Sequence, residues 1–94
     1  MQISFPADLP EYRARDWTIA FTALVDNVRV PCAITAEALE DHFGAPSIGE
    51  RDLTDAFERH RTEIERAARR MLEAVGGRPV VLHSGLFRFE RCRS

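Results

Sequence analysis

The stretch from Leu53 to Val75 constrains the fold more than any other part of the sequence, because its apolar residues recur at helical spacing. At 3.6 residues per turn they fall within an arc of roughly 100°, the width of a stripe that packs against a core. The stripe comprises Leu53, Phe57, His60, Ile64, Ala67, Ala68, Met71 and Val75. The spacing predicts one amphipathic helix over about residues 50–75, which Gly76-Gly77 ends.

Two alternating segments upstream predict a β-hairpin with strands over residues 17–25 and 28–35. Asp26-Asn27 between them tolerates positive φ, as a two-residue hairpin turn requires. This turn sets the register and brings the apolar side chains of both strands, Trp17 included, onto one face. The facing pairs are Val25 with Val28, Ala23 with Val30, Phe21 with Cys32 and Ile19 with Ile34. The second strand should be a sheet edge near Pro31, which has no N–H to donate.

Shorter signals complete the expected elements. A short helix is predicted over residues 36–43, with Thr35 as its N-cap and Gly44 at its end. Short strands are predicted over residues 3–5 and 80–82, whereas residues 8–15 are typical of a polar connection. For the last residues, about 86–94, the alternation around Phe87 and Phe89 leaves an edge strand and a free tail both open.

The expected fold class is therefore α+β in two layers. A small antiparallel sheet of three to five strands, centred on the hairpin 17–25/28–35, packs on the long helix over about 50–75, with the short helix 36–43 beside it. A length of 94 residues predicts a single domain over residues 1–94, with about 88–94 as an uncertain C-terminal tail.

Composition excludes several classes of protein. With 45% hydrophobic and 30% charged residues, the chain has the balance of a soluble globular protein. No apolar run approaches the roughly 20 residues that a transmembrane helix needs, so no membrane association is expected. Two cysteines sixty residues apart, without a charged and apolar leader in the first ten residues, favour reduced thiols and a cytoplasmic location.

The charge pattern disfavours nucleic-acid binding. Thirteen arginines, no lysine and fifteen acidic residues give a net charge of −2. Along the long helix, opposite charges alternate at i,i+4 or i,i+3 spacing, which predicts mutual pairing on a solvated face. The expected pairs are Asp55 with Arg59, Glu65 with Arg69, Arg69 with Glu73 and Glu63 with Arg66. An alternative is a nucleic-acid or phosphate site formed by Arg59, Arg66 and Arg70.

No motif in the sequence names a reaction. His60 lies within the apolar stripe, where it is either a core histidine with a hydrogen-bond partner or a general base or ligand. Together with Arg61 and Glu63 it forms the candidate site of a small ligand-binding protein or enzyme. The three histidines are far apart in sequence and no CxxC, HExxH or phosphate-binding glycine loop occurs, so no metal and no cofactor are expected.

The outward face of the hairpin is small, flat and only mildly polar. Its side chains belong to Thr18, Ala20, Thr22, Leu24, Arg29, Pro31, Ala33 and Thr35. Such a face either stays in contact with water or pairs with its twin from another subunit. The sequence is therefore compatible with a homodimer and with a monomer whose outer hairpin face contacts water.

The order of these signals resembles the DUF1488 family, a group of small bacterial proteins of unknown function. The resemblance begins at Ile3-Ser4-Phe5-Pro6, continues through the hairpin and the short helix, and is most specific at Ala56-Phe57 to His60-Arg61. It covers about residues 3–87 and implies an α+β domain in the bacterial cytoplasm with no established activity. The leading hypothesis is accordingly a non-enzymatic accessory or protein-interaction module, either self-associating or with an unknown protein partner.

Overall fold

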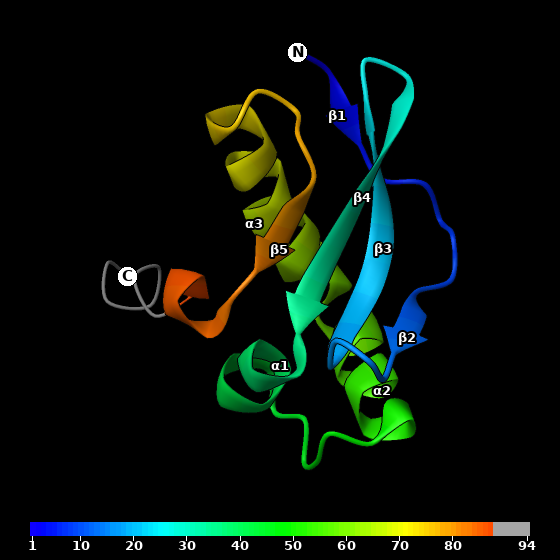
Figure 1. The fold of residues 1–94 in the computed structure, drawn as a ribbon, viewed down its shortest axis with the longest axis vertical. Helices are drawn as coiled ribbons and strands as arrows, with labels where there is room; N and C mark the ends of the chain where they lie inside the picture. Colours follow the sequence, from blue (N-terminus) through cyan, green and yellow to red (C-terminus); the bar gives the residue numbers. More distant parts are fainter. Residues whose placement is uncertain (88–94) are drawn as a thin grey trace.

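The structure, a computed structural model, describes residues 1–87 and has an α+β fold, as the sequence predicts. A five-stranded sheet lies in one layer, and helices cover one of its faces (Figure 1). The strands are β1 (Ile3–Ser4), β2 (Glu11–Arg13), β3 (Thr18–Val25), β4 (Val28–Thr35) and β5 (Val80–Leu82). The helices are α1 (Ala36–Phe43), α2 (Glu50–Arg59) and α3 (Arg61–Ala74). The strand order is β1-β3-β4-β5, with β2 also paired to β3.

The central hairpin has the predicted register from end to end. Val25 faces Val28, Phe21 faces Cys32, and each intervening pair follows. Asp26 and Asn27 have φ values of 51° and 69°, the left-handed conformation that the type I′ turn requires. The two turn residues therefore determine how the central strands β3 and β4 pair.

The prediction for the start of the hairpin is wrong at Trp17. Residues Glu11–Arg13, expected to be a polar connection, form β2 and pair antiparallel with β3. A tight turn over residues 14–17 joins the two strands, and Trp17 takes a φ of 53° to close it. Its side chain is 49% exposed instead of lying on the inner face. A left-handed tryptophan is rare because its Cβ approaches the following carbonyl, so alternation alone could not reveal this turn.

The sheet is mixed, not purely antiparallel as expected. β5 runs parallel to β4, with Cys32 facing Val80 and Ile34 facing Leu82. The three helices between these strands return the chain to the end of the sheet where β4 begins, and such a crossover produces a parallel pair. The partner of β4 begins only at Cys32, so residues 28–31 remain an edge, as Pro31 predicts.

The expected long helix is divided in two at His60, which has φ −116° and ψ 22°. Its N–H is shared between Ala56 O at 3.1 Å and Phe57 O at 3.2 Å. α2 contacts β2 and β3 whereas α3 contacts β5, and the strands of a sheet are twisted relative to one another. Because α2 and α3 have separate axes, each helix packs along the strands that it contacts. The sequence gives no warning, because kinks of this kind are usually marked by proline or glycine.

The core lies between the helices and the inner face of the sheet. Five members of the predicted stripe are fully buried, and Met71 and Val75 pack against the core from its margin. Phe57 contacts Phe21 with ring centroids 5.2 Å apart. The short helix is capped as expected, with Thr35 Oγ1 accepting from Ala38 N–H and Gly44 in the left-handed region. Residues 84–87 are helical, so no strand forms at Phe87, and the expectations for Phe89 and residues 88–94 lie outside the described residues.

Candidate functional site

His60 lies at the break between α2 and α3 and is only partly buried, with 37% of its side chain exposed. Its ring packs against Phe43 at the end of α1, with centroids 5.2 Å apart. Its Nδ1 is 3.6 Å from Glu63 Oε1, which is beyond hydrogen-bond distance. His60 and Glu63 are therefore neighbours on the surface, and His60 is not the enclosed core histidine that the stripe suggested.

Arg61 points away from His60 and holds the N-terminal segment against the helix break. Its Nη2 donates to Pro6 O at 3.2 Å and to Asp8 O at 2.9 Å. Its Nε donates to Glu65 Oε2 at 2.8 Å, and its Nη1 lies 3.3 Å from Glu58 Oε1. The guanidinium also lies 5.4 Å from the centroid of the Phe57 ring. With these partners and 21% exposure, Arg61 has little donor capacity left for a ligand.

The structure thus brings together two of the three predicted site residues. His60 and Glu63 are adjacent, and Arg61 contacts a different part of the molecule. Two surface hollows formed by described residues are considered next, and neither is lined by any of the three. A histidine beside a carboxylate can move a proton, but a general base also needs a substrate held within hydrogen-bond reach.

The ion pairs on the helices differ from those predicted by spacing. Asp55 and Arg59 pair as expected, at 3.1 Å. Glu65 pairs with Arg61 instead of Arg69, and Glu63 turns to His60 instead of Arg66. Glu65 has an arginine four residues away on either side within α3, and it pairs with Arg61 on its N-terminal side. Of the three arginines proposed for phosphate binding, Arg59 is paired and Arg70 is engaged in an interaction of its own.

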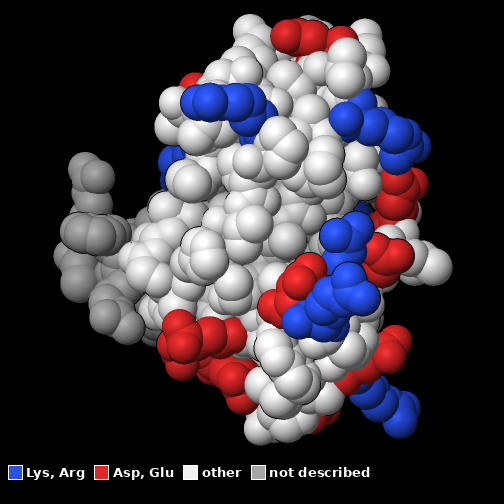
Figure 2. Space-filling view, in the orientation of Figure 1, with Lys and Arg blue, Asp and Glu red and all other residues white. Residues whose placement is uncertain are grey.

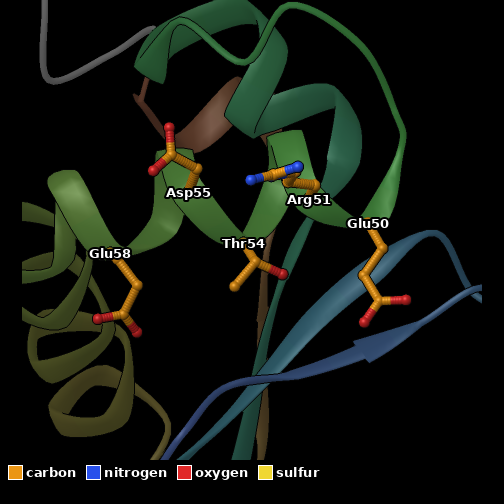
Figure 3. A pocket seen from close by; sticks show the side chains of 5 residues that line it. All are labelled: Glu50, Arg51, Thr54, Asp55 and Glu58. Atoms are coloured by element: carbon orange, nitrogen blue, oxygen red, sulfur yellow. The ribbon is translucent and has the colours of Figure 1, made fainter.

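The larger hollow, of about 570 Å³, follows the outer side of α2. It is lined by Glu50, Arg51, Thr54, Asp55 and Glu58. In Figure 3 the three carboxylates leave the helix in different directions and do not converge on a common point. Among the described residues, no three His, Cys, Asp or Glu side chains are placed to hold a metal ion. The hollow is a shallow acidic surface, not a metal centre.

The smaller hollow, of about 200 Å³, lies between α3 and the segment that follows β1. Phe5 lines one side, and Thr62, Glu65, Arg66 and Arg69 line the other. The sequence analysis missed this site because Phe5 and α3 are more than fifty residues apart. Arg66 and Arg69 are visibly spaced for one side of a helix. The predicted ion pairs with Glu63 and Glu65, however, implied that both arginines were neutralised and did not indicate a binding site.

Within residues 1–87, the outer face of the sheet carries no helix. Strand alternation directs alternate side chains of β3 and β4, and Val81 of β5, to this face. Figure 2 shows a broad uncharged area over the strands, with charged groups at its margins. The register places Ala20, Thr22, Leu24, Pro31, Ala33, Thr35 and Val81 on this face, which we call the open face. The charged residues Glu11, Arg13 and Arg29 share this side of the sheet, and Thr18 points the same way but is buried. At its margins lie the ion pairs Arg13 with Glu11 and Arg29 with Asp8, both at 2.9 Å.

Comparison with known proteins places the chain in a family. Residues 3–82 match the family described as protein of unknown function (DUF1488). The chain belongs to the DUF1488 family. No curated protein and no solved structure matches it. The match covers the five strands, the three helices and the break at His60, whereas the helical turn over residues 84–87 lies beyond it.

This DUF1488 protein also has a Ser-His-Asp cluster that the sequence did not reveal. His42 Nε2 lies 3.0 Å from Ser84 O and 3.1 Å from Ser84 Oγ. Ser84 Oγ donates to Asp41 Oδ2 at 2.8 Å. A carbonyl oxygen only accepts, so the contact with Ser84 O assigns the proton to His42 Nε2.

That proton rules out a catalytic triad in this arrangement. His42 cannot take the hydroxyl proton of Ser84 while its Nε2 is protonated, and the carboxylate contacts the serine instead of the histidine. Within the described part of the chain, the buried Nδ1 of His42 has no hydrogen-bond partner. The cluster fastens the helical turn that begins at Ser84 to α1, and the 43 residues between its partners explain why no local signal predicted it.

The thiol of Cys32 is a core group in the DUF1488 fold. It is free and buried on the inner face, with 3% exposure. Burial raises its pKa from 9.0 to about 11, against weaker opposing hydrogen bonds from the backbone. A thiol that stays protonated and enclosed is a poor nucleophile.

Within residues 1–87, no helix combines the length and apolar character needed to cross a bilayer.

Proposed function

We propose that this DUF1488 protein is a non-enzymatic protein-interaction module and that its partner is a second copy of itself. The observation that carries the proposal is the open face, an area without charged side chains over β3, β4 and β5 on which no element of residues 1–87 packs (Figure 2). A soluble sheet face that remains in water usually carries charged or polar side chains at alternate positions. The corresponding positions on the open face are instead occupied by Leu24, Val81, alanines, threonines and a proline.

Trp17 gives the open face an anchor at one end. It immediately precedes β3, has a left-handed backbone and leaves 49% of its side chain exposed. A non-glycine residue in this conformation costs about 1–2 kcal/mol, and strained residues concentrate at functional surfaces. Tryptophan is also enriched among the residues that dominate binding energy at protein interfaces. An exposed, strained tryptophan beside an uncharged face supports binding of a partner.

The size of the open face fits a reversible dimer. β3 and β4 have eight residues each, which gives a length of about 27 Å at 3.4 Å per residue. A width of three strands at about 4.8 Å gives roughly 400 Å² per copy, or about 800 Å² in total. This is the size of a weak, transient interface. We therefore expect a dissociation constant in the micromolar range and not an obligate dimer.

The charges at the margins favour a twin over another partner. One ion pair, Arg29–Asp8, lies near the hairpin turn. The other, Arg13–Glu11, lies near the opposite end of the strands. A two-fold axis across the strands would bring opposite ends of two copies together. Each arginine could then exchange its own carboxylate for one on the second copy, leaving no charge unpaired.

The proposed setting is the bacterial cytoplasm. The free, buried thiol of Cys32 supports a reducing environment, since the described residues offer it no disulfide partner. The Ser84 hydroxyl donates to Asp41 and not to His42, and His60 lines neither of the two hollows described. Both observations support a role without catalysis.

Sedimentation equilibrium over a range of concentrations tests the proposal, using the wild type, Thr22→Arg and Thr54→Arg. Thr22 lies in the middle of the open face, and an arginine there would bury a charge against its own twin. We expect Thr22→Arg to weaken dimerisation by at least about tenfold. Thr54, also half-buried, lies on α2 away from the open face, so the same change there should leave the dimer unchanged.

Two results would contradict the proposal. A wild type that stays monomeric into the high micromolar range would show that the open face is simply wet. A dimer that Thr22→Arg leaves intact would assign self-association to another surface. Circular dichroism of both variants establishes that each is folded before its association is compared.

A further inference from the structure

The smaller hollow supports a second site that does not depend on the open face. Thr62, Glu65, Arg66 and Arg69 are spaced so that they share one side of α3. Phe5 faces them from the segment after β1, and its ring continues into the core through Phe21, with centroids 6.3 Å apart. The hollow therefore has an aromatic wall fixed by the core and a polar wall fixed by a helix.

The lining of this hollow carries one net positive charge, because it has two arginines and one glutamate. Glu65 is paired with Arg61, whose Nε lies 2.8 Å from its Oε2 and whose Nη1 also pairs with Glu58. Glu63 lies toward His60. Within residues 1–87, neither Arg66 nor Arg69 forms an ion pair with a carboxylate. Two guanidinium groups thus line one small hollow beside a single carboxylate, which pairs with an arginine outside the lining.

We propose that this hollow binds a phosphomonoester dianion attached to a small apolar or aromatic group. Arg66 and Arg69 would each offer paired N–H donors, whose planar geometry matches phosphate oxygens. The Thr62 hydroxyl would donate a further hydrogen bond. Phe5 would pack against the apolar part of the ligand.

The dimensions favour a small phosphate compound over nucleic acid. A volume of about 200 Å³ is below the range of pockets that enclose a whole drug-sized ligand, so it fits a phosphate and the start of its substituent. A nucleic-acid site needs cations over several phosphates. Here Arg59 is already paired with Asp55, and the outer side of α2 carries Glu50, Asp55 and Glu58 (Figure 3).

The test is a titration followed by amide NMR shifts, with phenyl phosphate as the probe and inorganic phosphate and a short single-stranded oligonucleotide as comparison arms. We expect saturable shifts at Phe5, Thr62, Arg66 and Arg69, with phenyl phosphate binding more tightly than inorganic phosphate because of Phe5. Binding should weaken as pH falls below about 6, where the dianion gains a proton.

Matched variants separate this site from general electrostatic attraction. Arg66→Gln combined with Arg69→Gln should raise the dissociation constant for phenyl phosphate by at least about tenfold. Arg51→Gln combined with Arg59→Gln removes the same charge on α2 and should change it by less than about twofold. Equal losses in both pairs, or no saturable shift at millimolar phenyl phosphate, would overturn the proposal.

Tighter binding of the oligonucleotide than of phenyl phosphate would overturn it in favour of a nucleic-acid surface. None of these residues belongs to the open face, so failure of this site leaves the dimer proposal standing, and the reverse also holds.

Discussion

The two faces of the sheet are made by alternate residues of the same strands, yet they have opposite fates. On the inner face, Ile19, Ala23 and Ile34 are fully buried beneath the helices. On the outer face, Ala20 and Leu24 remain only half-buried, and Val81 is 44% exposed. The inner face has every partner it needs within the chain. The middle of the outer face is also uncharged, but no element of residues 1–87 covers it.

This difference separates stability from function. Burial of apolar area stabilises the fold by about 25 cal/mol per Å², and most of that burial occurs on the inner face. Substitutions there should lower the free energy of unfolding. Substitutions on the outer face should leave the isolated protein nearly unchanged and alter only what it binds.

The largest effect is expected at Phe57, which is fully buried between the helices and Phe21. Phe57→Ala should lower the free energy of unfolding by about 3–5 kcal/mol, through lost burial and the cavity left behind. The measurement is chemical denaturation under conditions where the protein is monomeric. Leu24→Ala on the outer face is the control and should cost less than about 1 kcal/mol. Similar losses for the two variants would remove the distinction between the faces.

Arg61 should have the next largest effect, because it seals the edge of the inner layer. Arg61→Gln removes the donors to Pro6 O and Asp8 O and leaves Glu65 without its partner, so we expect a loss of about 1.5–3 kcal/mol. Arg59→Gln removes the same charge two residues earlier, from an exposed pair with Asp55, and should cost under about 0.5 kcal/mol. A comparable loss from both variants in chemical denaturation would show that Arg61 acts only through surface charge.

The sequence predicted the inner layer well because local chemistry determines it. Asp26-Asn27 sets the turn, the turn sets the register, and the register sets every inward pair of the hairpin. The helical spacing of Leu53, Phe57 and Ile64 then identifies the layer that covers it. These are relations between residues close in sequence or repeated with a fixed period.

What could not be predicted depends on residues brought together only by the tertiary fold. The break at His60 follows from packing on different strands and has no local signal. Glu65 has two arginines at i,i+4 spacing, Arg61 and Arg69, and spacing alone does not select between them. Arg61 was proposed as a site residue, but its partners Pro6 and Asp8 lie more than fifty residues away. For the same reason, neither the hollow at Phe5 nor the cluster at Ser84 was visible in the sequence.

A smaller effect on the inner face should come from the Cys32 thiol at high pH. Its pKa is raised from 9.0 to about 11 by burial, so between these values the folded state keeps a proton that the unfolded state releases. Stability should therefore be unaffected below pH 9 and fall as pH rises toward 11, by about 1–2 kcal/mol. The comparison is Cys92→Ser with and without Cys32→Ala, measured by denaturation at each pH. Equal slopes for the two proteins would contradict a raised pKa at Cys32.

The smallest effect is expected at Trp17 and has the opposite sign. Glycine adopts a φ of 53° without steric cost, so Trp17→Gly should raise the stability of the monomer by up to about 1 kcal/mol, since part of the relieved strain is offset by the greater freedom of glycine in the unfolded chain. If Trp17 anchors the second copy, the same variant should dimerise more weakly. Chemical denaturation measures the change in stability, and sedimentation equilibrium measures the change in dimer affinity. A variant that is less stable would show that the tryptophan packs into its own monomer, and one that dimerises as well as the wild type would remove Trp17 from the interface. A gain in stability joined to a loss of association is the outcome specific to a residue kept strained for its partner, because ordinary surface or core positions do not combine the two.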